Sequence, residues 1–220
     1  MTKEFFEAVK KGDLPAVKEW LAKDPGVANA KTENGFSAIV LAAYYGQGEA
    51  MNAILAAGPT LSIHDAALVG DLSQVTDMLG RDGSLVSARS PDGFTPLGLA
   101  AYMGRPDVVR FLLSKGADVN YAAPETGFTA LTGAVNENQT ETVRVLVEHG
   151  ADVNHRYEDI RFSPLMNAAF NGNLEIAKTL VDRGADVNAR TTDGKTPLSI
   201  AVEKGNEGVA AFLRNHGARA

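Results

Sequence analysis

The chain has 220 residues, of which 45% are hydrophobic, and a formal net charge of -6 at pH 7. This composition allows a packed core and excludes a disordered or fibrous protein. The net negative charge gives no sign of the clustered Lys and Arg that bind a polyphosphate backbone, so nucleic acid is not expected as a partner. No cysteine is present, which excludes disulfides, thiol nucleophiles and Cys-ligated metal sites.

The N-terminal segment, MTKEFFEAVKKGD, lacks the apolar core of a secretory signal. No stretch of the chain comes near the roughly 18 uninterrupted apolar residues of a membrane span. We therefore expect a cytoplasmic protein with no membrane partner. The letters FFEAVKKG within this segment are a faint copy of a unit that recurs along the rest of the chain.

A repeated unit organises the sequence. The segments GFTPLGLAAYMG, GFTALTGAVNEN, RFSPLMNAAFNG and GKTPLSIAVEKG begin at residues 93, 127, 161 and 194, and GADVN recurs at 116–120, 150–154 and 184–188. Fainter copies lie at 5–12, 35–46 and 61–70. The pattern predicts seven units, at about residues 1–32, 33–58, 59–90, 91–124, 125–158, 159–191 and 192–220.

Each unit predicts two helices and a turn. Thr95 before Pro96 is typical of an N-cap followed by proline at the first helical position, and Gly104 is typical of a helix end. A second helix with apolar spacing follows and ends at a basic residue and Gly116, where the positive charge suits the helix dipole. The ADVN segment and the polar residues after it then form the turn to the next unit.

These residues resemble the ankyrin repeat. The pattern TPL-x-x-A-A-x-x-G, an apolar helix and then G-A-D-V-N recurs in register over essentially the whole chain. The resemblance implies an all-α solenoid of about seven helix-turn-helix units, one ankyrin repeat domain over 1–220, with projecting hairpin loops like fingers and a concave face made by the fingers and the first helices. The family's usual histidine after TPL is represented here only by His64.

One finger is missing. In AILAAGPTLSIHDAALVGD, residues 53–71, Gly58 aligns with Gly116 and Leu61 aligns with Thr95, so the segment between the second and third units has been deleted. Gly58 can adopt positive φ, and Pro59 prevents the helix from continuing. Two interpretations remain open. The deletion is a neutral change, since loops tolerate deletions, or it leaves a notch between the second and third units that is part of the functional surface.

No arrangement typical of catalysis is present. The glycines recur at a fixed period, at helix ends and turns, and do not form a phosphate-binding loop or a dinucleotide-binding fingerprint. No nucleophile elbow occurs either. We therefore expect no enzyme and no catalytic, cofactor-binding or metal-binding residues. The sequence predicts structural roles for His64, for His149 and His216 at helix ends, and no evident partner for His155.

Three asparagines of the DVN segments occupy positions that can be hydroxylated in the ankyrin repeat family. They are Asn120, Asn154 and Asn188. We interpret them as plain turn residues, because asparagine is favoured in turns for its own hydrogen bonding.

Large side chains gather at the end of the first helices, chiefly in units two to four, where the family contacts its partners. Tyr and Met are over-represented at protein interfaces, whereas other units carry polar pairs at this place. The expected partner-binding residues are Tyr44, Tyr45, Leu68, Val69, Tyr102, Met103 and Phe170. Because the missing finger would have flanked the first four of these, we expect them to be more accessible than their equivalents.

The sequence thus predicts a monomeric, non-catalytic protein-protein interaction scaffold that binds another protein through its concave face, centred on units two to four. The alternative is a small-molecule or metal-dependent enzyme that uses the notch around residues 56–69 as its pocket. Trp20 aligns with Leu112 and Leu146, so it is expected in the core of the first unit.

Overall fold

The computed structural model describes residues 2–156 and 161–219. Its regular elements are short helices, and the only strand-like pairing in these residues is an isolated antiparallel bridge between Lys31 and Ser37. The expected all-α fold is confirmed. In chain order the helices are α1 (Thr2–Lys11), α2 (Leu14–Lys23), α3 (Ala38–Tyr44), α4 (Gly48–Ala56), α5 (Ile63–Val69), α6 (Leu72–Arg81), α7 (Pro96–Tyr102), α8 (Pro106–Ser114), α9 (Ala130–Asn136), α10 (Thr140–Glu148), α11 (Pro164–Asn171), α12 (Leu174–Asp182), α13 (Pro197–Glu203) and α14 (Glu207–Asn215), with 3-10 turns η1 (Pro25–Asn29) and η2 (Gly83–Ser87).

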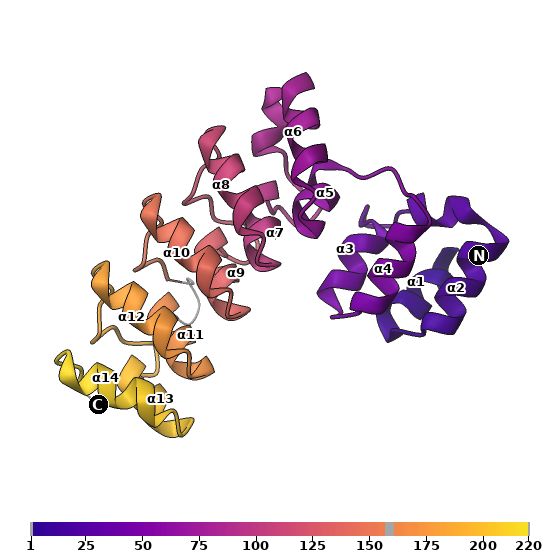
Figure 1. Cartoon of the computed structure of the whole chain (residues 1–220). Coiled ribbons are helices and arrows are strands. Elements are labelled where there is room, and N and C mark those ends of the chain that lie inside the picture. The colour runs from indigo at the N-terminus through magenta and orange to yellow at the C-terminus, as the bar shows by residue number, and fades with distance from the viewer. Residues whose placement is uncertain (1, 157–160, 220) are drawn as a thin grey trace. The chain divides into compact units, whose positions relative to one another are not determined.

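The chain divides into two compact units, Met1–Ala66 and Ala67–Ala220, here named the N-terminal and C-terminal units. In the N-terminal unit α1 packs on α2 and α3, and α4 packs on α2 and α3. In the C-terminal unit α7, α9, α11 and α13 form one row of inner helices, and α6, α8, α10, α12 and α14 form a row of outer helices (Figure 1). In the earlier repeats the first helix of each pair, α1, α3 or α5, is likewise called inner, and the second helix, α2 or α4, is called outer. The division falls within α5, directly after the connection that lacks a finger.

Hydroxyl caps begin the inner helices, as the Thr-Pro and Ser-Pro pairs predict. Thr95 Oγ1 accepts a hydrogen bond from Gly98 N at 3.2 Å at the start of α7. Proline occupies the first turn of α7, α11 and α13, where its missing N–H leaves no carbonyl unpaired. These caps fix where each inner helix starts.

Side-chain amides at the start of the outer helices bond to the end of the inner helix in the preceding repeat. Asn206 Nδ2 donates to Ala169 O at 2.8 Å and to Phe170 O at 3.0 Å, and Gln47 Nε2 donates to Lys10 O at 3.2 Å. The carbonyls at a helix C-terminus have no partner within the helix, so these bonds, here named amide ties, satisfy them while joining two repeats.

A second connection between repeats, here named the asparagine rung, comes from the turns. Asn120 Oδ1 accepts from Asp152 N at 2.8 Å, and Asn154 repeats the bond to Asp186 N at 2.9 Å. The side-chain nitrogen of each asparagine donates to the helix-ending glycine of the same neighbouring repeat, Gly150 or Gly184. Asn29 and Asn188 make rungs of the same kind to Thr60 N and Arg219 N. The repeated asparagines are therefore structural connectors.

The hydrophobic core runs between the two helices of each repeat. Leu112 and Leu146 are fully buried, as the apolar spacing of the outer helices predicts. Trp20, at the aligned position of α2, is only half-buried and lines a hollow of about 480 Å³ together with Ala8 and Ala16. The expectation that Trp20 is a core residue is wrong, because no described element covers this side of α1 and α2.

None of the helices in the described ranges is long and apolar enough to cross a bilayer.

The asparagine rungs should be worth measurable stability. We predict that Asn154→Ala lowers the free energy of unfolding by about 2 kcal/mol, or about 1 kcal/mol for each of the two hydrogen bonds lost. Urea unfolding followed by far-UV circular dichroism measures the change.

Ser87 provides the control, because it takes the rung position of the third repeat and its hydroxyl donates only to Ser84 O, 3.2 Å away in the same turn. Ser87→Ala should change stability by no more than about 0.5 kcal/mol. Equal losses in the two variants would mean that the rungs do not stabilise the stack.

Candidate functional site

The residues expected to contact a partner are distributed over both units. Tyr44 and Tyr45 belong to the N-terminal unit, whereas the C-terminal unit holds Leu68, Val69, Tyr102, Met103 and Phe170. All of them lie in the last turn of an inner helix or directly after it. The name inner-helix surface is used here for the helix ends of either unit, and each unit is described by itself.

In the N-terminal unit the two tyrosines differ in exposure. Tyr45, which follows the last residue of α3, leaves 53% of its surface exposed. Tyr44 is half-buried, and its ring meets the Phe36 ring edge-on with the centroids 6.1 Å apart. Packing against the finger therefore fixes Tyr44, and Tyr45 is the side chain that a partner can cover.

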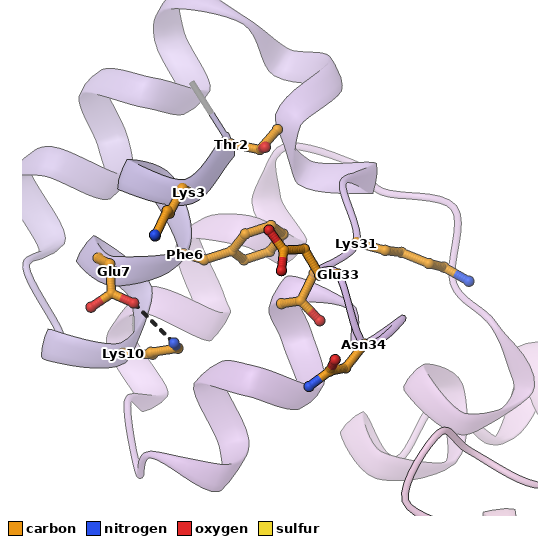
Figure 2. A pocket seen from close by; sticks show the side chains of 9 residues that line it. Thr2, Lys3, Phe6, Glu7, Lys10, Lys31, Glu33 and Asn34 are labelled. Atoms are coloured by element: carbon orange, nitrogen blue, oxygen red, sulfur yellow. Dashed lines mark hydrogen bonds and ion pairs between the residues drawn. The ribbon is translucent and has the colours of Figure 1, made fainter.

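A hollow of about 270 Å³ opens between α1 and the finger that precedes α3 (Figure 2). Phe6 forms its apolar floor, and the Lys31 side chain extends away from it. The polar groups of its wall are Thr2, Lys3, Glu7, Lys10, Lys31, Thr32, Glu33 and Asn34. Repeat alignment gives no signal for this hollow, because the alignment of helix ends does not place a finger beside the first helix of the preceding repeat.

The charges around the hollow largely neutralise each other. Lys10 Nζ lies 2.9 Å from Glu7 Oε1. The hydrogen bond to Lys10 lowers the pKa of Glu7, and the same bond raises the pKa of Lys10. A mixed rim around an aromatic floor can receive one polar side chain of a partner, but it does not concentrate charge of either sign.

In the C-terminal unit Leu68 is fully buried, so the expectation that it would be more accessible than its equivalents is wrong. The reason is the start of α5. Ser62 Oγ accepts from Asp65 N at 3.2 Å and caps the helix, so Leu68 is the sixth residue after its cap, as the fully buried Ala101 is after Thr95. Alignment on the helix-ending glycines had matched Leu68 with Tyr102 instead.

The same shift changes the position of the histidine motif. The third residue after the cap of α5 is Asp65, and His64 comes one residue earlier. Asp65 is almost completely buried and accepts hydrogen bonds from Ser62 N at 2.9 Å and from the hydroxyl of Ser37, which caps α3. This carboxylate therefore joins the starts of two inner helices, a role that the sequence analysis missed.

Tyr102 and Met103 are half-buried at the end of α7. Burial of the Tyr102 phenol, and then the charge of Glu137 with which it shares a hydrogen bond, raise its pKa above the ordinary value. Val69 is also half-buried. These side chains offer part of their surface to a partner, and the hydrogen bond with Glu137 of the next repeat holds Tyr102 in place.

Phe170, at the end of α11, leaves 49% of its surface exposed. Lys204 Nζ lies 4.2 Å from the centre of its ring, in the geometry of a cation-π contact. Beside it Lys195 and Glu203 form an ion pair of 2.7 Å. Phe170 is thus an exposed aromatic ring in contact with a lysine of the next repeat.

Three histidines form hydrogen bonds with backbone carbonyls. The Nδ1 atoms of His149 and His216 lie 2.8 Å from Val145 O and Phe212 O at the ends of α10 and α14, where a structural role was predicted. His155 Nε2 lies 2.7 Å from Gly127 O, so the expectation that it lacks a partner is wrong. Among residues 2–156 and 161–219 no three His, Cys, Asp or Glu side chains are grouped as metal ligands.

Family models for ankyrin repeats match most of the chain. A model of three ankyrin repeat copies matches residues 63–157, a model of many copies matches 146–201, and a single ankyrin repeat matches 193–220. The chain belongs to the ankyrin repeat family. The ankyrin models match from residue 63 onward, and the N-terminal unit carries the same paired helices, amide tie and asparagine rung.

Curated relatives share parts of this ankyrin chain. The human DNA-binding protein RFXANK is 40% identical over 72 residues, which cover 33% of this chain and 28% of that protein. The human NAD-capped RNA hydrolase NUDT12 is 42% identical over 55 residues, or 25% of this chain and 12% of the relative. The mouse protein phosphatase 1 regulatory subunit 27 is 40% identical over 57 residues, or 26% and 36%. The chain thus spans about a third or less of the length of these relatives.

The burial difference between Leu68 and Tyr45 gives a stability test. Leu68→Ala should lower the free energy of unfolding by 2–5 kcal/mol, the usual range for a large aliphatic side chain removed from a core. Tyr45→Ala should lower it by no more than about 0.5 kcal/mol, because the side chain is exposed and Tyr45 caps α3 only through its backbone N–H, which alanine keeps. Thermal unfolding of both variants measures the two effects, and a Tyr45→Ala loss as large as that of Leu68→Ala would show that Tyr45 belongs to the core.

Proposed function

We propose that this ankyrin chain is a non-catalytic scaffold that binds another protein through its inner-helix surface. The observation that carries the proposal is the exposure of Tyr45 and Phe170, two large aromatic side chains at neighbouring positions of the repeat. Aromatic residues of this kind are enriched among the side chains that dominate binding energy in protein interfaces. In this proposal the chain acts as a cytoplasmic monomer without a cofactor.

The remaining contact residues have graded roles in this proposal. Tyr44 in the N-terminal unit and Val69, Tyr102 and Met103 in the C-terminal unit are half-buried and supply further contact area. Leu68 supports the end of α5 from within. The hollow beside Phe6 accepts a polar side chain of the same partner.

The charges on the outer helices support this choice of surface. On the outer helices Arg144 bridges Glu141 at 2.9 Å and Glu175 at 2.7 Å, and Arg110 extends the chain of ion pairs from Glu141 to Asp107. These charges are satisfied within the protein, and covering them would cost desolvation. Burying the exposed aromatic rings of the inner-helix surface is favourable instead.

The relatives support an interaction role of this general kind. The ankyrin repeat is a protein-interaction module, and one relative is by name a regulatory subunit of protein phosphatase 1. The relative RFXANK is by name a DNA-binding protein. For the present chain the net charge of -6 favours a protein partner over DNA, because binding to a phosphate backbone requires clustered positive charge.

Tyrosine truncation tests the proposed surface. Tyr45→Ala and Tyr102→Ala should each weaken binding of the partner by about tenfold, which corresponds to about 1.4 kcal/mol for each anchor. The partner is first identified as a protein retained from native extract by the wild-type chain and not by the empty matrix, and its affinity for each variant is then measured by titration with purified protein.

Leu72→Ala is the matched control, because Leu72 is also an exposed apolar residue but begins the outer helix α6. It should leave the affinity unchanged. Full affinity in the double tyrosine variant together with a loss in Leu72→Ala would place the interface on the outer helices. Saturable binding of duplex DNA at physiological salt would contradict the choice of a protein as partner.

A further inference from the structure

We infer that the chain has a built-in opening point at α5, at which the N-terminal unit unfolds before the C-terminal unit and separately from it. The inference concerns the conformational behaviour of the array and does not depend on the proposed binding function. It rests on the side chains that are available to connect consecutive repeats at each position along the chain.

Elsewhere consecutive repeats are connected by the asparagine rung, the amide tie or both, or by a side chain in their place, as where Ser87 makes no rung but Arg105 Nε donates to Leu68 O. In the N-terminal unit the rung of Asn29 reaches Thr60 N at 2.7 Å and the amide tie of Gln47 reaches Lys10 O at 3.2 Å. In the C-terminal unit the rung of Asn154 and the tie of Asn206 do the same for later repeats. The rung needs an amide side chain and the tie needs a side chain with an N–H donor, each at a fixed place in the repeat.

Neither amide is available at the start of the third repeat. The finger that would carry the rung is deleted, so that six residues, 57–62, lead from α4 to α5. The position of the amide tie is occupied by Asp71, which as a carboxylate can only accept hydrogen bonds. Both of its oxygens are used within its own helix, by Gln74 N and Gln74 Nε2, each at 3.0 Å.

The two ends of α5 are instead held by different units. At its start the Asp65 carboxylate accepts from the hydroxyl of Ser37, within the N-terminal unit. At its end Leu68 O accepts from Arg105 Nε at 3.1 Å, within the C-terminal unit. The division between the compact units falls between these two bonds, after Ala66.

Like the other seven-residue inner helices, α5 depends on side-chain connections to its neighbours to transmit cooperativity, and it lacks both the rung and the tie on the side of the second repeat. Isolated helices shorter than about 12 residues are marginal in water, because nucleation is costly. In a repeat array stability is approximately the sum of the stability of each repeat and the terms between neighbours, so one weak junction separates the array into blocks. The N-terminal block holds two complete helix pairs, α1 to α4, and is the smaller of the two, so it opens first.

The chain carries a natural reporter for this opening. Trp20 is its single tryptophan and lies in α2, so its fluorescence reports the N-terminal unit, whereas far-UV circular dichroism reports all helices. In urea we expect the fluorescence transition to have a lower midpoint than the main circular dichroism transition. Coincident transitions at every urea concentration would overturn the inference.

Two fully buried isoleucines allow a matched comparison, Ile54 in α4 and Ile176 in α12. Ile54→Val should lower the fluorescence midpoint and leave the late circular dichroism step in place. Ile176→Val should lower the late step and leave the fluorescence midpoint in place. If either variant shifted both transitions by the same amount, the chain would unfold as one block and the inference would be wrong.

Hydrogen exchange followed by mass spectrometry provides a second readout that does not depend on Trp20. In low urea, peptides from α1 to α4 should lose protection together while peptides from α9 to α12 keep it. Simultaneous loss in both groups would count against separate opening.

Discussion

The hydrogen bonds of side-chain amides between repeats are the interaction on which the rest of this structure depends. A repeat of two short helices cannot bury its apolar face alone, so it must be stacked in register with its neighbours. The asparagine rung sets that register at the turn, and the amide tie sets it at the end of the inner helix. Both bonds satisfy backbone groups that would otherwise lack a partner, which makes a shift in register costly.

The array displays different chemistry on its two sets of helices because of this register. The outer helices bring Arg110, Glu141 and Arg144 into a continuous chain of ion pairs. The ends of the inner helices present aromatic rings: the amide tie of Asn206 holds the backbone at Phe170, and the Phe36 ring packs against Tyr44 beside Tyr45. A partner that covers Tyr45 or Phe170 therefore meets a preorganised surface, which reduces the entropy lost on binding.

Much of the fold could be predicted because its signals are local. Thr95 before Pro96 marks a helix start and Gly104 marks an end whatever lies around them, and the fixed period reports the stacking. The candidate site was harder to predict, because exposure depends on packing. Leu68 looked like a surface residue when counted back from a glycine, but the Ser62 cap shifts α5 by one residue and buries it.

Other features of the site depend on contacts between distant residues and left no local signal. Asp65 looked like an ordinary helix residue until the Ser37 hydroxyl was found beside it. Trp20 shared the spacing of core leucines, yet its burial depends on whether an element covers its side of α2. Repeat alignment therefore predicts which position a residue occupies, whereas its environment is set by the neighbouring repeat.

The most direct test of the account is a hydrogen-exchange footprint of the chain with and without its bound partner. The account predicts new protection in the segments that end the inner helices, around residues 44–46, 102–104 and 170–172, and unchanged exchange along α8, α10 and α12. Protection confined to those outer helices, with none at the inner-helix ends, would contradict it.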